Sequence, residues 1–328
     1  MLDAILEVKN LSVAFSRRGN KLEAVRGVSL DVFPGEIVGI VGESGSGKSL
    51  TMKSVMGILP ESAQRKADVL RLGNRNLLTI SQDELYKVRG SEMTMIFQDP
   101  MTALNPLQTI GRHLEEVILR HKKISKSEAR EQSIRMLNEV GIPDAETRLK
   151  QYPHEFSGGM RQRVLIAMAL SCEPKLLIAD EPTTALDVTI QAQILDLLKE
   201  LRDKHGTSIV LITHDMGVIA TLCSRVYVMY NGKIMESASV GEIFYEAQHP
   251  YTKALLNAIP DRSLASGTRL KPIEGSPPSL TRMPKGCPFV DRCKFALEEC
   301  RDHMPELISY KHNHMLACHL LKASAEEK

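Results

Sequence analysis

The amino-acid sequence has little excess charge of either sign and lacks a long apolar run. Lys and Arg together number 42, Asp and Glu together number 40, and the formal net charge is +2. This balance argues against a protein that binds nucleic acid through bulk positive charge. The apolar stretch VLIAMAL, residues 164–170, is far shorter than the ~20 residues that a membrane-spanning helix needs. We therefore expect a chain that neither crosses a bilayer nor binds nucleic acid through bulk charge.

We also expect no secretory leader, and the sequence shows no internal repeat and no low-complexity segment. The N-terminal stretch MLDAILEVKN has acids within its short apolar part and no basic segment before it, so it does not resemble a signal peptide. We therefore expect the protein in the cytoplasm. Its 43% hydrophobic and 25% charged residues are ordinary for a globular protein with a sizeable core.

Cysteine is scarce over most of the chain and concentrated near its end. Only Cys172 and Cys223 precede a group of four, which comprises Cys287, Cys293, Cys300 and Cys318. In a reducing compartment such a group favours metal or cluster ligation over disulfides. The spacing C-x5-C-x6-C-x17-C lacks the paired cysteines of structural zinc sites, so four separated thiolates favour an iron–sulfur cluster. Zinc and unligated thiols remain alternatives.

The pattern of apolar residues predicts an α/β fold with a parallel sheet. The stretches GEIVGIVG (35–42), KLLIADEP (175–182) and SIVLITHD (208–215) are nearly continuous apolar runs, which are typical of strands buried on both faces. Between the last two runs, apolar residues recur with helical spacing from Ile190 to Leu201. Strands that alternate with helices in this way favour parallel pairing.

Other stretches predict antiparallel strands and a helical segment. Residues 5–33 alternate apolar and polar residues around a turn, which favours an antiparallel layer. RVYVMYNGKIMES, residues 225–237, indicates a hairpin that turns at Asn231-Gly232. Residues from about 106 to 150 have helical periodicity, and the composition changes near Pro260, where a segment rich in Pro, Gly and Ser opens a small C-terminal unit.

The stretch GESGSGKS, residues 42–49, predicts a phosphate-binding loop. It matches the pattern G-x-x-x-x-G-K followed by Ser or Thr, and it lies between a buried strand and a predicted helix. Glycines allow backbone torsions that turn successive N–H groups toward an anion. Lys48 supplies positive charge to the β- and γ-phosphates, and the Ser49 hydroxyl can bind Mg²⁺. The candidate binding residues are Gly42, Glu43, Ser44, Gly45, Ser46, Gly47, Lys48 and Ser49.

Polar residues at the ends of three strands are candidates for the rest of a nucleotide site. Asp180 ends a buried strand, where a carboxylate can hold Mg²⁺, and Glu181 follows it and can polarise a water molecule. His214 and Gln98 end two further strands and could contact a phosphate, a water or Mg²⁺. The alternatives are solvated carboxylates, a capping histidine and an exposed glutamine.

A second candidate anion site lies at Ser157-Gly158-Gly159, within HEFSGGMRQR. A hydroxyl and two glycines stand where a loop is expected to become a helix. Free backbone N–H groups and the helix dipole favour an anion there. Since a complete phosphate-binding loop occurs earlier in the chain, this second site calls for a different anion.

In this order, the motifs resemble those of the ATP-binding subunits of ABC transporters. Phe15 takes the adenine-stacking position, residues 42–49 the Walker A motif and Gln98 the Q-loop. FSGGM (156–160) stands for the LSGGQ signature, with two departures that keep its serine and both glycines. The remaining matches are LLIADE (176–181) as Walker B, ALD (185–187) with Asp187 as the D-loop, and His214 as the switch histidine.

This resemblance implies a fold, an activity and a dimer. The fold is a P-loop NTPase with an antiparallel β subdomain, a helical subdomain at about 99–157 and a small cysteine-rich extension. Domains are expected at 1–255 and 256–328. Glu181 and His214 serve ATP hydrolysis, while Ser49, Gln98 and Asp180 hold Mg²⁺. Two such domains pack head to tail, so that Ser157, Gly158 and Gly159 contact the ATP of the partner domain.

The end of the chain resembles one group within that family. QHPYTKALLNAIP (248–260) and the cysteine region are similar to segments of the oligopeptide, dipeptide and nickel importer ATPases. That similarity implies peptide import and a 4Fe–4S cluster on the four cysteines. It also implies a second, related ATPase subunit, two permease subunits and a solute-binding protein, with this chain bound to the cytoplasmic face of the membrane. The alternatives are import of nickel or another small solute, a soluble ABC ATPase acting on nucleic acid, and a cysteine-cluster sensor.

Overall fold

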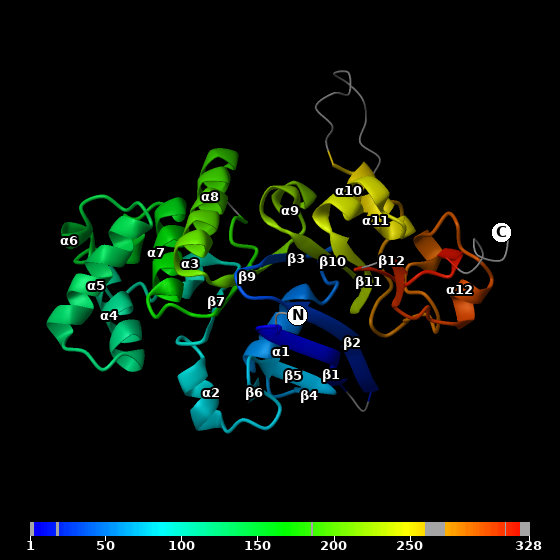
Figure 1. The fold of residues 1–328 in the computed structure, drawn as a ribbon, viewed down its shortest axis with the longest axis horizontal. Helices are drawn as coiled ribbons and strands as arrows, with labels where there is room; N and C mark the ends of the chain where they lie inside the picture. Colours follow the sequence, from blue (N-terminus) through cyan, green and yellow to red (C-terminus); the bar gives the residue numbers. More distant parts are fainter. Residues whose placement is uncertain (1–2, 18–19, 185, 260–272, 312, 322–328) are drawn as a thin grey trace, which may run out of the picture. The chain divides into compact units, whose positions relative to one another are not determined.

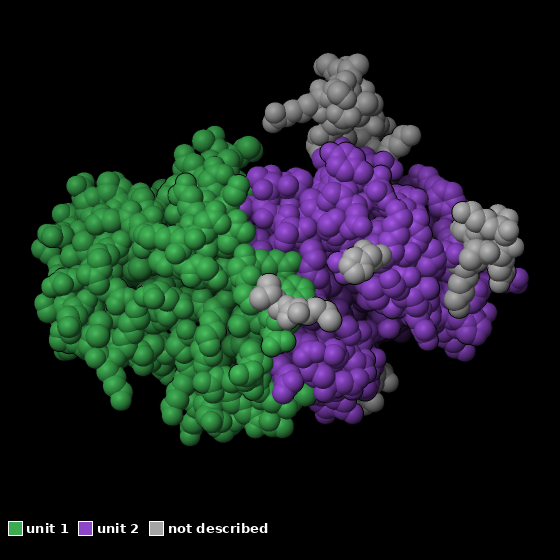
Figure 2. All heavy atoms as spheres, in the orientation of Figure 1, with its two compact units in different colours: residues 1–6, 32–36, 72–212 green, residues 7–31, 37–71, 213–328 purple. Residues whose placement is uncertain are grey.

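The computed structural model describes residues 3–17, 20–184, 186–259, 273–311 and 313–321. The chain forms two compact units (Figure 2). Unit 1 comprises residues 1–6, 32–36 and 72–212, and unit 2 comprises residues 7–31, 37–71 and 213–328. Among the described residues, no helix has both the length and the apolar character needed to cross a bilayer.

Unit 1 combines three parallel strands with a group of helices (Figure 1). Its elements are β6 (Arg75–Asn76), α2 (Gln82–Val88), β7 (Met93–Ile96), α3 (Pro100–Ala103), α4 (Ile110–His121), α5 (Lys126–Glu139), α6 (Ala145–Arg148), the 3₁₀ turn η1 (Pro153–Glu155), α7 (Gly158–Leu170), β8 (Leu176–Asp180), α8 (Val188–His205) and β9 (Ser208–Thr213). In the parallel ladder Ile178 of β8 pairs with Met95 of β7 and Val210 of β9. All residues of β8 and β9 are buried, as their continuous apolar runs predict.

The longer helices of unit 1 begin at residues whose side chains satisfy one of the first N–H groups. The Thr109 hydroxyl accepts a hydrogen bond from the Arg112 N–H at the start of α4, and Ser125 forms a capping box with Glu128 at the start of α5. Helices α4, α5 and α7 pack on one another, and α7 also packs on β7 (Figure 1). The periodic segment predicted at 106–150 is therefore helical, with interruptions at the caps.

Unit 2 holds an antiparallel layer and a second set of strands. It contains all or most of β1 (Leu6–Arg17), β2 (Asn20–Val32), β3 (Ile37–Val41), α1 (Lys48–Met56), β4 (Ala63–Lys66), β5 (Val69–Leu72), α9 (Met216–Leu222), β10 (Arg225–Tyr230), β11 (Lys233–Ser239), α10 (Val240–Glu246), α11 (Pro250–Asn257), η2 (Val290–Arg292), α12 (Glu299–Asp302), β12 (Ile308–Lys311) and β13 (His314–Leu316). Strand β1 lies between β2 and β5 and also pairs antiparallel with β4. The buried strand β3 pairs in parallel with β10.

The predicted hairpin and the α/β class are both confirmed. Strands β10 and β11 pair antiparallel, and the two residues between them, Asn231 and Gly232, have φ values of 47° and 81°. Two successive positive φ values are typical of the two-residue turns that suit a twisted hairpin.

The end of the chain contains strands that its sequence does not reveal. Strand β13 pairs antiparallel with β11, and β12 pairs with β13, so the C-terminal region extends the strands of unit 2. Phe289 and Val290 pack with Tyr230 and Tyr251 in one core cluster. These strands are too short to show a clear alternation of apolar and polar residues, so the sequence gives no local signal for them. Residues 260–272, where the composition changes, lie outside the described residues, and the boundary expected after residue 255 stays a prediction.

A fully buried carboxylate joins the C-terminal strands to β11. Glu236 accepts hydrogen bonds from the backbone N–H groups of Gln248 (2.7 Å) and His249 (3.1 Å). The Nε2 atom of His314, on β13, lies 2.8 Å from Glu236 Oε1 and is also fully buried. One side chain therefore satisfies three polar groups from two other segments, in a place where water cannot replace it.

We predict that Glu236→Ala lowers the free energy of unfolding by about 3–5 kcal/mol, because three buried polar groups lose their acceptor. Urea unfolding of the full chain measures this change. The control is Glu246→Ala, which removes the partner of Lys311 from a half-exposed ion pair and is expected to cost less than about 1 kcal/mol. Equal losses in the two variants would contradict a structural role for the buried carboxylate.

Candidate functional site

The loop between β3 and α1 requires glycine at defined positions. Gly42, Gly45 and Gly47 have φ values of 154°, 78° and 97°. A Cβ atom added at Gly42 would lie 2.1 Å from the Met229 carbonyl oxygen, and one at Gly47 would lie 2.9 Å from that of Ala24. The backbones of neighbouring strands therefore leave room only for hydrogen at these two positions.

The polar groups of this loop fit a phosphate ligand. Ser46 is 3% exposed, and its hydroxyl has no hydrogen-bond partner among the described residues. The buried Lys48 ammonium donates to the carbonyl oxygens of Gly42 (2.7 Å) and Glu43 (3.0 Å) within its own loop. Helix α1 begins at Lys48, and its N-cap residue, Gly47, provides no side-chain cap. An orphan hydroxyl, a lysine and an uncapped helix start are suited to an anion with several oxygens.

The other predicted residues of unit 2 lie in this loop, on β1 and after β9. Ser49 is partly buried in the first turn of α1, and Ser44 is exposed at the tip of the loop. Phe15 is partly buried on β1, opposite Ala63 of β4. His214 is exposed and comes directly after β9.

In unit 1, the two predicted acids stand at the end of β8 in different surroundings. Asp180 is the last residue of β8 and is 1% exposed. Glu181 is partly buried and has a φ of 47°, which is unusual for a residue other than glycine. Its backbone N–H donates to the Ile212 carbonyl oxygen at 2.9 Å. Such backbone strain persists only where the surrounding structure enforces it, and it turns the Glu181 side chain out of the strand direction.

Two polar side chains hold the Glu181 carboxylate. Gln98 Nε2 and Thr184 Oγ1 each donate a hydrogen bond of 2.8 Å to Glu181 Oε2. The structure therefore brings together Gln98 and Glu181, which are 83 positions apart in the sequence. Sequence analysis missed Thr184. Its position three residues after an acid, in the turn that follows a buried strand, is the only local signal for this contact.

The signature segment forms the start of a helix, as its sequence predicts. Ser157 is the N-cap of α7, and its hydroxyl accepts a hydrogen bond from the Met160 N–H at 3.3 Å. A Cβ atom added at Gly159 would lie 2.7 Å from Cγ2 of Ile190, so the start of α7 lies against the start of α8. Asp187 caps α8 by accepting from the Ile190 N–H at 2.9 Å. Ala185, the first residue of the predicted D-loop motif, lies outside the described residues.

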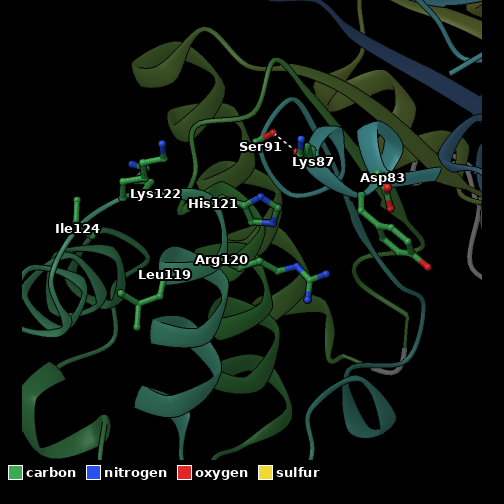
Figure 3. Close-up of a pocket in the computed structure, with 10 residues that line it drawn as sticks. Asp83, Lys87, Ser91, Leu119, Arg120, His121, Lys122 and Ile124 are labelled. Atoms are coloured by element: carbon green, nitrogen blue, oxygen red, sulfur yellow. Dashed lines mark hydrogen bonds between the residues drawn. The ribbon is translucent and has the colours of Figure 1, made fainter. Parts of the chain in front are cut away.

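The predicted site residues thus form two groups. Unit 2 contains the phosphate-binding loop, Phe15 and His214, whereas unit 1 contains Gln98, the two acids, the signature segment and Asp187. Unit 1 also has a basic hollow of about 890 Å³, in which Arg120 and His121 at the end of α4 project beside Lys87 of α2 (Figure 3). None of the predicted site residues lines this hollow.

The structure contradicts the predicted 4Fe–4S cluster and metal-binding assignment, and it offers no support for the zinc alternative. Within the described ranges, which include all four C-terminal cysteines, no three His, Cys, Asp or Glu side chains form a group that could hold a metal ion. Cys287, Cys293, Cys300 and Cys318 instead line a small cavity beside Phe289 and Val290. Burial raises the pKa of Cys287 to about 12 and that of Cys318 to about 11.

The physical reason for this error is that spacing along the sequence does not determine how side chains are packed. Metal ligation requires thiolates, and burial among apolar groups favours the neutral thiol. Cys287 and Cys300 are members of the core cluster that also contains Tyr251 and Phe289. Buried cysteines of this kind act as small apolar residues that fill the core.

Sequence analysis also missed two residues that contact the phosphate-binding loop. Arg292, in η2, forms an ion pair with Glu43, and the Tyr251 hydroxyl accepts a hydrogen bond from the Glu43 N–H. Both residues lie more than 200 positions from the loop. No local motif signals a contact over that separation.

Comparison with known proteins places these motifs in a family context. A family described as "ABC transporter" matches residues 25–184, and one described as "Oligopeptide/dipeptide transporter, C-terminal region" matches residues 235–300. The dipeptide transport ATP-binding protein DppD of Bacillus subtilis is 52% identical over 326 residues, covering 99% of this chain and 97% of DppD. The oligopeptide transport ATP-binding protein OppD of Escherichia coli is 50% identical over 316 residues, covering 96% and 93%.

Solved structures agree with these matches. The dimeric structure of MJ0796, described as a bacterial ABC transporter cassette, has a TM-score of 0.63 and 28% sequence identity. The similarity covers 72% of this chain and 98% of that cassette. A structure of cbiO1 from Clostridium perfringens, described as part of an ABC transporter complex, has a TM-score of 0.62 and 30% identity over 74% of this chain and 92% of its own.

Proposed function

This chain belongs to the ATP-binding subunits of the ABC transporter family, and we propose that it hydrolyses ATP to power import of di- or oligopeptides through a membrane transporter. The observation that carries the proposal is that relatives named for dipeptide and oligopeptide transport match almost the whole chain at about 50% identity. The match to the oligopeptide/dipeptide C-terminal region supports peptides over nickel or another small solute.

We infer that the loop from Gly42 to Ser49 binds the phosphates of ATP. The orphan hydroxyl of Ser46 and the left-handed glycines support this assignment, because they leave polar groups available to an anion. Lys48 would exchange its carbonyl partners for phosphate oxygens, and the family resemblance assigns adenine stacking to Phe15. The aromatic ring of Phe15, on β1, is partly buried, which leaves part of its surface to a base.

The residues that hold Mg²⁺ and those that follow β8 and β9 are proposed to serve hydrolysis. Bound Mg²⁺ would neutralise phosphate charge, with Ser49, Gln98 and Asp180 as the residues that hold it. Glu181 is the proposed base, which accepts a proton from the attacking water as the bond to the γ-phosphate breaks. Its carboxylate is oriented by hydrogen bonds from Gln98 and Thr184. His214 is proposed to stabilise the charge that develops on the γ-phosphate.

The signature segment is proposed to act on the ATP of a partner. The N–H groups at the start of α7, which include those of Gly158 and Gly159, favour an anion together with the helix dipole. Since the chain has its own phosphate-binding loop, we propose that Ser157 and these glycines contact the γ-phosphate bound by a second ATPase, with Asp187 at the same interface. ATP would then close a dimer, and hydrolysis would open it.

The proposed assembly contains a second, related ATPase, two permease subunits and a solute-binding protein. This chain would lie on the cytoplasmic face of the membrane, where ATP is available.

The domain limits proposed for this role are residues 1–255 for the ATPase, with a helical subdomain at about 99–157, and residues 256–328 for the C-terminal extension. A soluble ATPase acting on nucleic acid has no support from the named relatives or from the net charge of +2.

We predict that Glu181→Gln retains ATP binding and lowers the rate of hydrolysis by about 100-fold or more, because the amide cannot accept the proton. The variant is expected to accumulate as an ATP-bound dimer with its partner, which size-exclusion chromatography detects. Glu200→Gln, at an exposed position on α8, is the control. Unchanged turnover in Glu181→Gln would remove Glu181 from its proposed role.

A second prediction concerns the residue that the sequence did not reveal. Thr184→Val removes a hydrogen bond to Glu181 while nearly preserving side-chain shape, and we expect kcat to fall about tenfold with the Kd for ATP unchanged. Thr183→Val alters the adjacent residue and is expected to retain the wild-type rate. Equal rates for the two variants, or a loss of ATP affinity in Thr184→Val, would show that Thr184 does not orient the base.

A further inference from the structure

An arginine from the C-terminal region contacts the second residue of the phosphate-binding loop. Arg292 Nη1 lies 2.6 Å from Glu43 Oε2, and Nη2 lies 2.9 Å from Glu43 Oε1. The two parallel contacts form the bidentate arrangement in which guanidinium and carboxylate interact most strongly. The Arg292 side chain is 4% exposed and that of Glu43 is 26% exposed, so the pair is largely shielded from solvent and salt.

Arg292 is itself held in place by the segment around it. Its Nε donates to the Glu274 carbonyl oxygen (2.9 Å), Nη2 to that of Ile273 (3.2 Å) and Nη1 to the Tyr230 hydroxyl (3.1 Å). Each of the three guanidinium nitrogens therefore has a hydrogen-bond partner other than the Glu43 carboxylate. Because these anchors lie at 230 and 273–274, the position of Arg292 depends on the C-terminal region being docked in unit 2.

The backbone of Glu43 is also hydrogen-bonded to the C-terminal half of the chain. Its N–H donates to the hydroxyl of Tyr251, a fully buried residue of α11, at 2.9 Å. Its carbonyl oxygen accepts a hydrogen bond from Lys48 Nζ at 3.0 Å. Glu43 thus connects two residues of the C-terminal half, Tyr251 and Arg292, to the lysine that the proposed function places on the phosphates of ATP.

The charge of Glu43 explains why this loop needs the arginine. A carboxylate beside a site for a triphosphate repels the ligand, and the repulsion is strong where water is partly excluded. The Arg292 guanidinium neutralises that carboxylate and directs it toward the C-terminal region. Removal of Arg292 would leave a negative charge free to turn toward the phosphates and would release one restraint on the loop.

We propose that Arg292 is a positioning residue for nucleotide binding, which neutralises Glu43 and makes the ATP affinity of the loop depend on the docked C-terminal region. This inference rests on the proposed function, since it assigns ATP to the loop. Coupling between sites is reciprocal, so ATP must also stabilise the C-terminal segment that carries Arg292. The C-terminal region is then part of the nucleotide site and not only an appendage to it.

The test uses the full chain and measures the Kd for MgATP by equilibrium titration, together with KM and kcat. We expect Arg292→Gln to raise Kd and KM about tenfold with little change in kcat at saturation, because the effect lies in binding. Arg292→Lys is expected to fall between the wild type and Arg292→Gln, because lysine keeps the charge and loses the bidentate geometry. Arg301→Gln is the control, since Arg301 belongs to the same region and its side chain is 67% exposed.

The double variant Glu43→Gln/Arg292→Gln separates a loss of charge balance from a loss of folding. We expect it to recover most of the ATP affinity lost in Arg292→Gln, since no uncompensated carboxylate remains beside the phosphates. Hydrogen exchange of residues 286–300 in the wild type is expected to slow when MgATP is added. Thermal unfolding of each variant reports its stability.

Three outcomes would overturn the inference. Equal ATP affinities for Arg292→Gln and the wild type would remove Arg292 from nucleotide binding. An affinity that stays low in the double variant would show that charge neutralisation is not its role, and unchanged exchange at 286–300 would exclude coupling. Failure of the wild-type chain to bind ATP at all would instead contradict the proposed function, on which the inference depends.

Discussion

The phosphate-binding loop depends on close approaches of neighbouring backbone that only glycine permits, and this steric constraint governs its shape. Strand β3 precedes the loop, and α1 begins at its end. The backbones at Met229 and Ala24 approach Gly42 and Gly47 so closely that no larger residue fits. The C-terminal half adds hydrogen bonds to Glu43 from the remaining side. Unit 2 therefore serves as a scaffold that fixes one short loop.

The C-terminal region is a packed part of unit 2, whereas the spacing of its cysteines suggested a metal centre. Its strands extend β11, its apolar residues complete a core cluster with Tyr230 and Tyr251, and its arginine reaches the loop. The buried contact between Glu236 and His314 links β11 to β13. A region with few large apolar residues is thus stabilised by packing on the ATPase core, which also provides a physical reason for it to influence nucleotide binding.

The parts of the structure that could be predicted from the sequence are those in which the signal is local. Continuous apolar runs predicted β3, β8 and β9, and the Asn231-Gly232 turn predicted its hairpin. Strand burial and positive φ values each restrict the residue types within a short stretch of sequence. The ion pair between Glu43 and Arg292 spans 249 positions, and surface charges of both signs are common, so nothing in the sequence singles it out. The four cysteines misled for the opposite reason. Their spacing resembles a ligand set, but only the packing of side chains determines whether thiols face a metal or an apolar core.

The central claim is that this chain couples ATP hydrolysis to peptide import. Its most direct test is the rate of ATP hydrolysis by the complex of this chain with its partner ATPase, permease subunits and solute-binding protein in lipid nanodiscs. Di- and oligopeptides, nickel and sugars would be compared as ligands of the binding protein. The account predicts that hydrolysis rises when the binding protein carries a peptide, and that this rise is absent when this chain carries Glu181→Gln. A rate that no peptide changes, but that nickel, a sugar or nucleic acid raises, would contradict it.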